Sequence, residues 1–266
     1  MSTITIDSFQ CPPNKQKNYD KLVERGRQRL EESRVVIAGL GRNIEKQIVP
    51  AVSAFSEFGG LCKDYAIFVY ENDSTDNTVP NMHKAKRLHP KFRFRSEALS
   101  DPANRSVRCL QRTTRMAAYR EEVQKFVRNN FADWDYVVLY DFDLGDKFSK
   151  LGLTTTFGHK FKWDAMLGNS IFHKRGWAYY DVWALRWQNS YKPLWSRDVN
   201  PIRWWPGDDP FEVYSAFGGL GVYEMRAFLN GRYNGTDCEH VPFHKHMRDN
   251  GFGKIFLNPN QVTLYS

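Results

Sequence analysis

The sequence predicts an α/β protein with a mostly parallel sheet and helices on both faces. Three short runs rich in β-branched and apolar residues, at 34–40, 65–70 and 136–140, indicate buried strands because each is too short for a comfortable helix. Apolar residues recur at helical spacing in the segments between these runs. Strands that alternate with helices in this way are typical of a doubly wound parallel sheet.

The first half of the chain follows this alternation element by element. Pro50 falls inside the second expected helix, where it would kink that helix or delay its start. We expect, in chain order, a helix at 16–33, a strand at 34–40, a helix at 44–58, a strand at 65–70, a helix at 79–89, a strand at 92–95, a helix at 107–131 and the strand at 136–140.

The second half has a different character. A further strand is expected at 164–169, and the stretches 173–187 and 203–217 are rich in Trp, Tyr and Phe. Rings interleaved with polar residues suit a sugar pocket, because sugar C–H faces stack on rings while the hydroxyl groups need hydrogen bonds. The alternative is that these rings simply fill the core. No linker divides the chain, so we expect one domain over 1–266.

Composition excludes several classes of protein. The chain has 266 residues, 41% of them hydrophobic and 15% aromatic, which indicates a globular protein and not a disordered one. No apolar run approaches the roughly 18 residues that span a bilayer, and no signal peptide is visible, so we expect a cytoplasmic protein. The net charge of +8 favours anionic partners, but the basic residues are scattered, which favours local phosphate contacts over nucleic acid.

Two carboxylates follow the strand at 136–140. Asp141 and Asp143 would lie outside the carboxyl end of that strand, which is where open α/β sheets bind their ligands. Carboxylates are hard oxygen ligands that suit Mg²⁺ or Mn²⁺, and such an ion can hold a diphosphate. This pattern predicts a metal–nucleotide site. The alternative is a solvated acidic turn.

Polar residues also follow the expected strands at 34–40 and 65–70. The segment 71–78 begins with Glu71, Asn72 and Asp73, whose short acceptor groups suit a nucleoside base and ribose but also suit a turn that caps the next helix. The first strand ends in Gly39 and continues into Arg42. This segment lacks the third glycine of a dinucleotide fingerprint, which disfavours a dehydrogenase.

The order of these acidic strand ends resembles the GT-A family of nucleotide-sugar glycosyltransferases. Residues 237–259 are similar to the late part of that family, in which an acidic pair opens a helix, a glycine ends it and an edge strand containing a proline follows. Residues 180–186 and 215–223, together with Arg112 and Arg115, resemble the fungal capsule-associated α-1,3-mannosyltransferase-like proteins. The resemblance covers roughly residues 34–260.

The resemblance implies a metal-dependent glycosyltransferase that builds a glycan or polysaccharide. It implies Mn²⁺ or Mg²⁺ as cofactor, a GDP- or UDP-sugar as donor, a nucleotide-sugar-binding half at about 34–145 and an acceptor-binding half at about 146–266. Asp143 would be the main metal ligand, supported by Asp141. The spacing of His240 and His244 predicts that they share a helix face, from which His244 would complete the metal coordination; the alternative is a helix cap with ordinary surface histidines. The donor contacts would come from Gly39, Arg42, Glu71, Asn72, Asp73, Arg112, Arg115, Asp141, Gly218 and Gly219.

Three residues are candidates for catalysis. Glu239 and His240 would act as general base or stabilise a positively charged sugar, and Asp181 lies in the acceptor half. His240 stands where many inverting members of the family carry the aspartate that serves as base. This departure slightly favours retention of the anomeric configuration.

Other interpretations remain open at this point. Asp208, Asp209 and Glu212 would bind sugar hydroxyls or be ordinary solvated acids. A sugar nucleotidyltransferase would use the same fold, although the segment after the first strand is short for its phosphate loop. A non-catalytic carbohydrate-binding module would explain the aromatic residues but not the two acidic strand ends.

Overall fold

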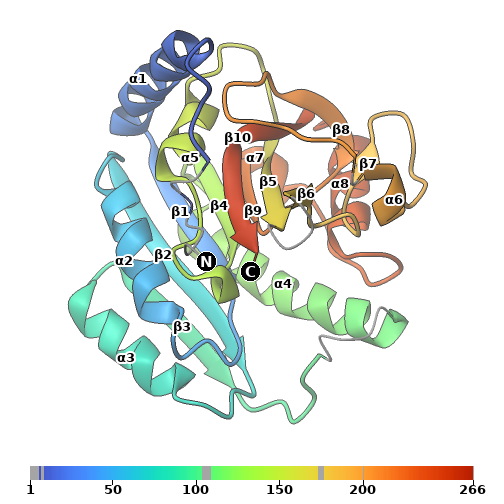
Figure 1. Ribbon diagram of the computed structural model, residues 1–266. Helices are drawn as coiled ribbons and strands as arrows, with labels where there is room; N and C mark the ends of the chain where they lie inside the picture. The colour runs from blue at the N-terminus through green and yellow to red at the C-terminus, as the bar shows by residue number, and fades with distance from the viewer. Residues whose placement is uncertain (1–5, 7–8, 104–108, 173–176, 200, 266) are drawn as a thin grey trace, which may run out of the picture.

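The computed structural model describes residues 6, 9–103, 109–172, 177–199 and 201–265 (Figure 1). Within these residues the strands form one mixed sheet in the order β3-β2-β1-β4-β9-β5-β10-β8-β7, with β6 beside β5. The expected α/β class is confirmed.

The first half of the chain alternates as predicted. The helix α2 begins at Ile48, four residues later than expected, and Pro50 is its third residue. In the first turn of a helix the missing N–H of proline costs no helical hydrogen bond. The elements are α1 (Gln16–Glu32), β1 (Arg34–Leu40), α2 (Ile48–Gly59), β2 (Asp64–Asn72), α3 (Thr78–Leu88), β3 (Phe92–Glu97), α4 (Leu110–Phe131) and β4 (Tyr136–Asp141).

The second half joins the sheet largely through antiparallel strands. A short 3₁₀ turn, η2 (Phe142–Leu144), follows β4 directly. The remaining elements are α5 (Lys150–Phe157), β5 (Ala165–Phe172), β6 (Ala178–Tyr179), β7 (Arg186–Trp187), α6 (Ser196–Val199), β8 (Phe211–Ser215), β9 (Leu220–Glu224), α7 (Met225–Leu229), α8 (His240–Asp249) and β10 (Ile255–Tyr265). The expected strand at 164–169 is therefore present as β5.

The last strand is not the edge strand that the sequence predicts. β10 lies between β5, to which it is parallel, and β8, to which it is antiparallel. Its proline is accommodated by an irregularity: the pairing with β5 shifts register between Asn258 and Val262, and Pro259 falls within that shift. A proline has no N–H for the ladder, and a bulge is where an internal strand tolerates one.

Two apolar layers cover the sheet. One packs α4, α7 and α8 on one face, and the other packs α1, α2, α3 and α5 on the opposite face (Figure 1). Because β3, β2, β1 and β4 are parallel, their carboxyl ends lie along one edge of the sheet. The start of α4 lies beside this edge. No helix in the described part of the chain is long and apolar enough to cross a bilayer.

Candidate active site

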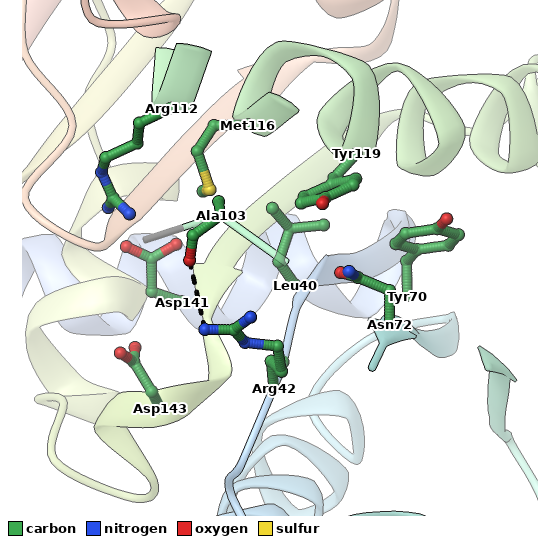
Figure 2. Close-up of a pocket in the computed structure, with 11 residues that line it drawn as sticks. Leu40, Arg42, Tyr70, Asn72, Ala103, Arg112, Met116, Tyr119, Asp141 and Asp143 are labelled. Carbon is green, nitrogen blue, oxygen red and sulfur yellow. Dashed lines mark hydrogen bonds between the residues drawn. The ribbon is translucent and has the colours of Figure 1, made fainter. Parts of the chain in front are cut away.

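A pocket opens at the carboxyl ends of β1, β2 and β4. Its cavity volume is about 130 Å³, and it is open to solvent. Figure 2 shows its residues: Asp141, Asp143 and Arg112 lie on one side, and Tyr70, Asn72 and Tyr119 on the other. The lining residues are Leu40, Gly41, Arg42, Tyr70, Asn72, Ala103, Arg112, Met116, Tyr119, Asp141 and Asp143.

The end of β1 contributes Arg42 to the pocket. The Arg42 guanidinium donates to the carbonyl oxygen of Ala103 at 3.1 Å, which holds the side chain across the pocket (Figure 2). Gly39, also predicted as a donor contact, does not line the pocket. It lies within β1 opposite Tyr140, and a Cβ there would come within 1.8 Å of the Tyr140 carbonyl oxygen. Gly39 thus allows β1 and β4 to approach closely.

The end of β2 contributes only one of its three predicted contacts. Asn72 lines the pocket. Glu71 is buried and accepts hydrogen bonds from the Ser74 N–H at 2.7 Å and from the Ser96 hydroxyl. Asp73 accepts one from the Ser100 N–H at 2.8 Å. The two carboxylates therefore hold the loops beside the pocket in place.

The two predicted arginines of α4 have different surroundings. Arg112 lines the pocket and faces the two aspartates (Figure 2). Arg115 is absent from the lining and donates from Nε to Asp101 at 2.7 Å. Arg115 is therefore held by Asp101 outside the pocket, and only Arg112 of the two reaches the site.

Asp141 and Asp143 both line the pocket because η2 turns the chain directly after β4. The described residues contain no cluster of three or more His, Cys, Asp or Glu side chains that could hold a metal ion. Mg²⁺ and Mn²⁺ sites on nucleotides commonly use one or two carboxylates and complete their coordination with phosphate oxygens and water. The two aspartates fit a metal of that kind.

A buried arginine that the sequence analysis does not single out joins the two halves of the site. Arg120 of α4 has a side chain that is 4% exposed, and it donates to Asp141 at 2.9 Å and to Glu239 at 2.9 Å. Its guanidinium lies 4.8 Å from the centre of the Phe217 ring. Arg120 lies eight residues after Arg112 on α4, about 80° away around the helix axis, so no local spacing identifies it as part of the site.

The tandem glycines lie in a left-handed turn before β9. Gly218 and Gly219 have φ of 66° and 72°, a conformation that favours glycine. The Gly218 N–H donates to Asp181 at 2.9 Å, and the Gly219 carbonyl oxygen accepts from the Asp141 N–H at 2.9 Å. The turn therefore holds Asp181 near the end of β4.

Asp181 is partly buried beside other acids. Loss of solvent, and then the charges of Asp141 and Glu239, raise the pKa of its carboxyl group to about 7, against the lowering effect of the Gly218 N–H. Such a pKa suits a group that exchanges a proton near neutral pH. The structure therefore brings the predicted Asp181, Glu239 and Asp141 into one charged cluster.

His240 begins α8 beside this cluster. Its side chain is 2% exposed, its ring stacks on Phe217 with centroids 3.8 Å apart, and Nε2 lies 3.6 Å from Glu239. Neither ring nitrogen has a hydrogen-bond partner among the described residues. Burial, then the neighbouring Arg120 charge, lowers the pKa of His240 well below its usual value, so the ring is neutral.

His244 does not take the metal-ligand position predicted for it. It shares a helix face with His240, as expected, but that face points into the core. Nδ1 lies 2.8 Å from the Ser215 hydroxyl and Nε2 lies 3.0 Å from the Tyr223 hydroxyl, and the side chain is fully buried. With both nitrogens engaged, His244 has no lone pair to offer an ion in the pocket.

The other acids of the second half lie outside the pocket lining. Asp208 pairs with Lys15 and accepts a hydrogen bond from the Trp205 N–H at 2.8 Å. Glu212 accepts one from Gln188. Asp209, too, does not line the pocket.

The fold resembles solved glycosyltransferase structures. GalNAc-T7 with UDP, GalNAc and Mn²⁺ matches with a TM-score of 0.53 and 11% identity over 88% of this chain. The mannosyltransferase PcManGT from Pyrobaculum calidifontis, in complex with GDP-Man and Mn²⁺, matches with a TM-score of 0.50 and 10% identity over 95% of this chain. A fragment of S. aureus TarS matches with a TM-score of 0.50 and 12% identity over 87% of this chain.

The matches cover 44%, 66% and 60% of those three chains, respectively. At these identities the similarity establishes the fold, which is that of GT-A glycosyltransferases. The sequence matches no protein-family model and no curated protein.

Proposed function

We propose that this protein is a metal-dependent glycosyltransferase that moves a sugar from a nucleoside-diphosphate sugar to a glycan or polysaccharide acceptor. The observation that carries the proposal is the composition of the pocket at the ends of β1, β2 and β4. It combines two carboxylates, two arginines and a wall of aromatic and apolar side chains in one hollow. The shared fold with nucleotide-sugar enzymes supports the same conclusion.

The two sides of the pocket suit the two ends of a nucleotide. Tyr70, Tyr119 and Asn72 line the side that would take the base and ribose, since the rings offer an apolar wall and an amide bonds the polar edge of a base (Figure 2). Arg42 and Arg112 would contact the diphosphate, because a guanidinium binds phosphate oxygens in a forked geometry.

Asp143 and Asp141 would hold Mn²⁺ or Mg²⁺ against the diphosphate. Such an ion supplies Lewis-acid stabilisation of the charge that develops on the leaving diphosphate. Asp141 keeps one oxygen on Arg120, so we assign the principal ligand role to Asp143 and a supporting role to Asp141. No further protein ligand is proposed, since His244 is engaged elsewhere.

The acceptor side would use Asp181, Glu239 and His240. Arg120 fixes the Glu239 carboxylate, and the neutral His240 ring packs on Phe217. Asp181 has the pKa of a group able to take a proton from an acceptor hydroxyl near pH 7. A base that activates the acceptor hydroxyl for direct displacement of the diphosphate gives inversion, whereas retention requires a covalent intermediate or attack on the same face as the leaving group. The anomeric configuration of the product, read by proton NMR, separates these mechanisms.

Calorimetric titration tests the donor site. We expect UDP or GDP to bind in the presence of Mn²⁺ and to lose about tenfold or more in affinity when the metal is chelated. Asp143→Asn should abolish the increase in nucleotide affinity that the metal gives. Asp146→Asn, which alters an exposed carboxylate outside the pocket lining, should leave that increase unchanged. The proposal fails if no nucleoside diphosphate binds in a metal-dependent way.

A further inference from the structure

A second hollow lies beside the donor pocket. Its cavity volume is about 210 Å³, and it lies between the start of α4, the turn that carries Trp183 and the loop before α8. Its lining residues are Cys109, Leu110, Thr113, Trp183, Gly235, Thr236, Asp237 and Cys238.

The two hollows share a wall. Thr113 lines the second hollow and Arg112, its neighbour on α4, lines the donor pocket. The Arg112 guanidinium lies 5.9 Å from the centre of the Trp183 ring. A ligand on Trp183 would therefore lie directly across Arg112 from the diphosphate side of the donor pocket.

The loop of the second hollow leads into the charged cluster. Cys238 is followed by Glu239, which Arg120 connects to Asp141. The Cys238 thiol lies 3.9 Å from a carboxylate oxygen of Glu239, and both residues are buried, so Glu239 lies directly behind this side of the hollow. A hydroxyl group bound against Cys238 would therefore lie one side chain away from Glu239.

The loop is held in a fixed shape. Arg186, with a side chain that is 1% exposed, donates to both oxygens of Asp237 at 3.0 and 2.8 Å, and also to the Trp183 carbonyl oxygen at 2.9 Å. One buried guanidinium thus fixes Trp183 and Asp237, which come from segments 54 residues apart, relative to one another. Preorganised groups of this kind bind without a large ordering cost.

We propose that this second hollow is the acceptor subsite, and that it takes a neutral sugar residue whose C–H face stacks on Trp183. The proposal rests on the proposed function. Trp183 supplies the flat apolar surface, and Thr236 and Asp237 supply hydrogen-bonding groups for hydroxyls. Asp237 is the only charged residue among the lining residues described, which favours an uncharged acceptor over a phosphorylated or acidic one.

The test measures sugar binding and nucleotide binding separately on the full chain. Saturation-transfer NMR with a panel of p-nitrophenyl α- and β-hexopyranosides reports sugar binding, and calorimetry with Mn²⁺ and UDP or GDP reports the donor site. Trp183→Leu removes the ring, Trp183→Phe keeps an aromatic face, and Thr236→Val removes an exposed hydroxyl at low risk to folding. Trp195→Leu is the matched control, since Trp195 is exposed and lines none of the described hollows.

We expect Trp183→Leu to weaken binding of the preferred hexoside about tenfold, with smaller losses in Trp183→Phe and Thr236→Val and no change in Trp195→Leu. Nucleotide affinity should stay within about twofold in all four. Unchanged sugar binding in both Trp183→Leu and Thr236→Val would overturn the subsite. A loss of nucleotide affinity in Trp183→Leu as large as its loss of sugar affinity would overturn it too. If the wild type binds hexosides but no nucleotide, the proposed function fails and the sugar subsite stands. If it binds nucleotide but no hexoside, the subsite fails alone.

Discussion

Replacing Arg120 with methionine removes the buried cation that pairs with both Asp141 and Glu239. The Glu239 side chain is 6% exposed and that of Asp141 is 26% exposed, so leaving the Glu239 charge unpaired costs more free energy than leaving the Asp141 charge unpaired. Removing one partner of a buried ion pair costs about 3–5 kcal/mol, and solvent screens the Asp141 contribution. For a domain of this size that loss lowers the melting temperature by roughly 6–20 °C.

Calorimetry and urea unfolding near pH 7.5 measure this loss. The double variant Arg120→Met/Glu239→Gln should recover about 1 kcal/mol or more relative to Arg120→Met alone, because the amide carries no charge to leave buried. Arg115→Met is the control: its partner Asp101 is 55% exposed, so the loss should stay within about 1 kcal/mol. Equal losses in Arg120→Met and Arg115→Met, or strict additivity in the double variant, would refute the reasoning.

Two further predictions concern Asp181 and the tandem glycines. Burial raises the pKa of Asp181 in the folded state to about 7, above its ordinary value, so the folded state holds the carboxyl proton more tightly than the unfolded state. The resulting contribution to stability is lost as pH rises from about 4 through 7. Asp181→Asn should therefore raise the melting temperature at pH 8 but not at pH 4, and a pH-independent difference would contradict this. Gly218→Ala forces a φ of 66° on alanine and places its Cβ 2.3 Å from a carbonyl oxygen, which should cost about 2–4 kcal/mol in urea unfolding. Gly251→Ala, with a φ of 89° and open space around its Cβ, should cost less, and an equal cost would argue against the steric explanation.

The sequence predicts the N-terminal half of the fold well because that half depends on local signals. The runs that form β1, β2 and β4 are apolar on both sides, as a covered parallel sheet requires, and the intervening helices show their period. The start of α2 is misplaced because Pro50 can either interrupt a helix or lie in its first turn.

The C-terminal half depends on contacts that no local pattern specifies. β9 enters between β4 and β5, and β10 enters between β5 and β8, so each position in the sheet is decided by strands far away in the chain. A proline usually indicates an edge strand, and only the bulge at Asn258 makes it compatible with an internal one.

The candidate site shows the same division. The strand-end residues Asp141, Asp143 and Asn72 could be predicted because parallel strands end at one edge. The spacing of His240 and His244 correctly places them on one helix face but cannot say that the face points inward. The partnership of Arg120 with Glu239 joins residues 119 positions apart, and it becomes visible only in the folded chain.

The internal position of β10 has a consequence for biosynthesis. β5 and β8 leave the ribosome before β10, yet each has β10 as a neighbour in the finished sheet. At roughly 5–20 residues per second, the nascent chain spends several seconds with these strand edges unpaired. An uncovered strand edge is a template for association with another chain. Folding of this protein is therefore most exposed to aggregation during the interval in which residues 216–265 are being made.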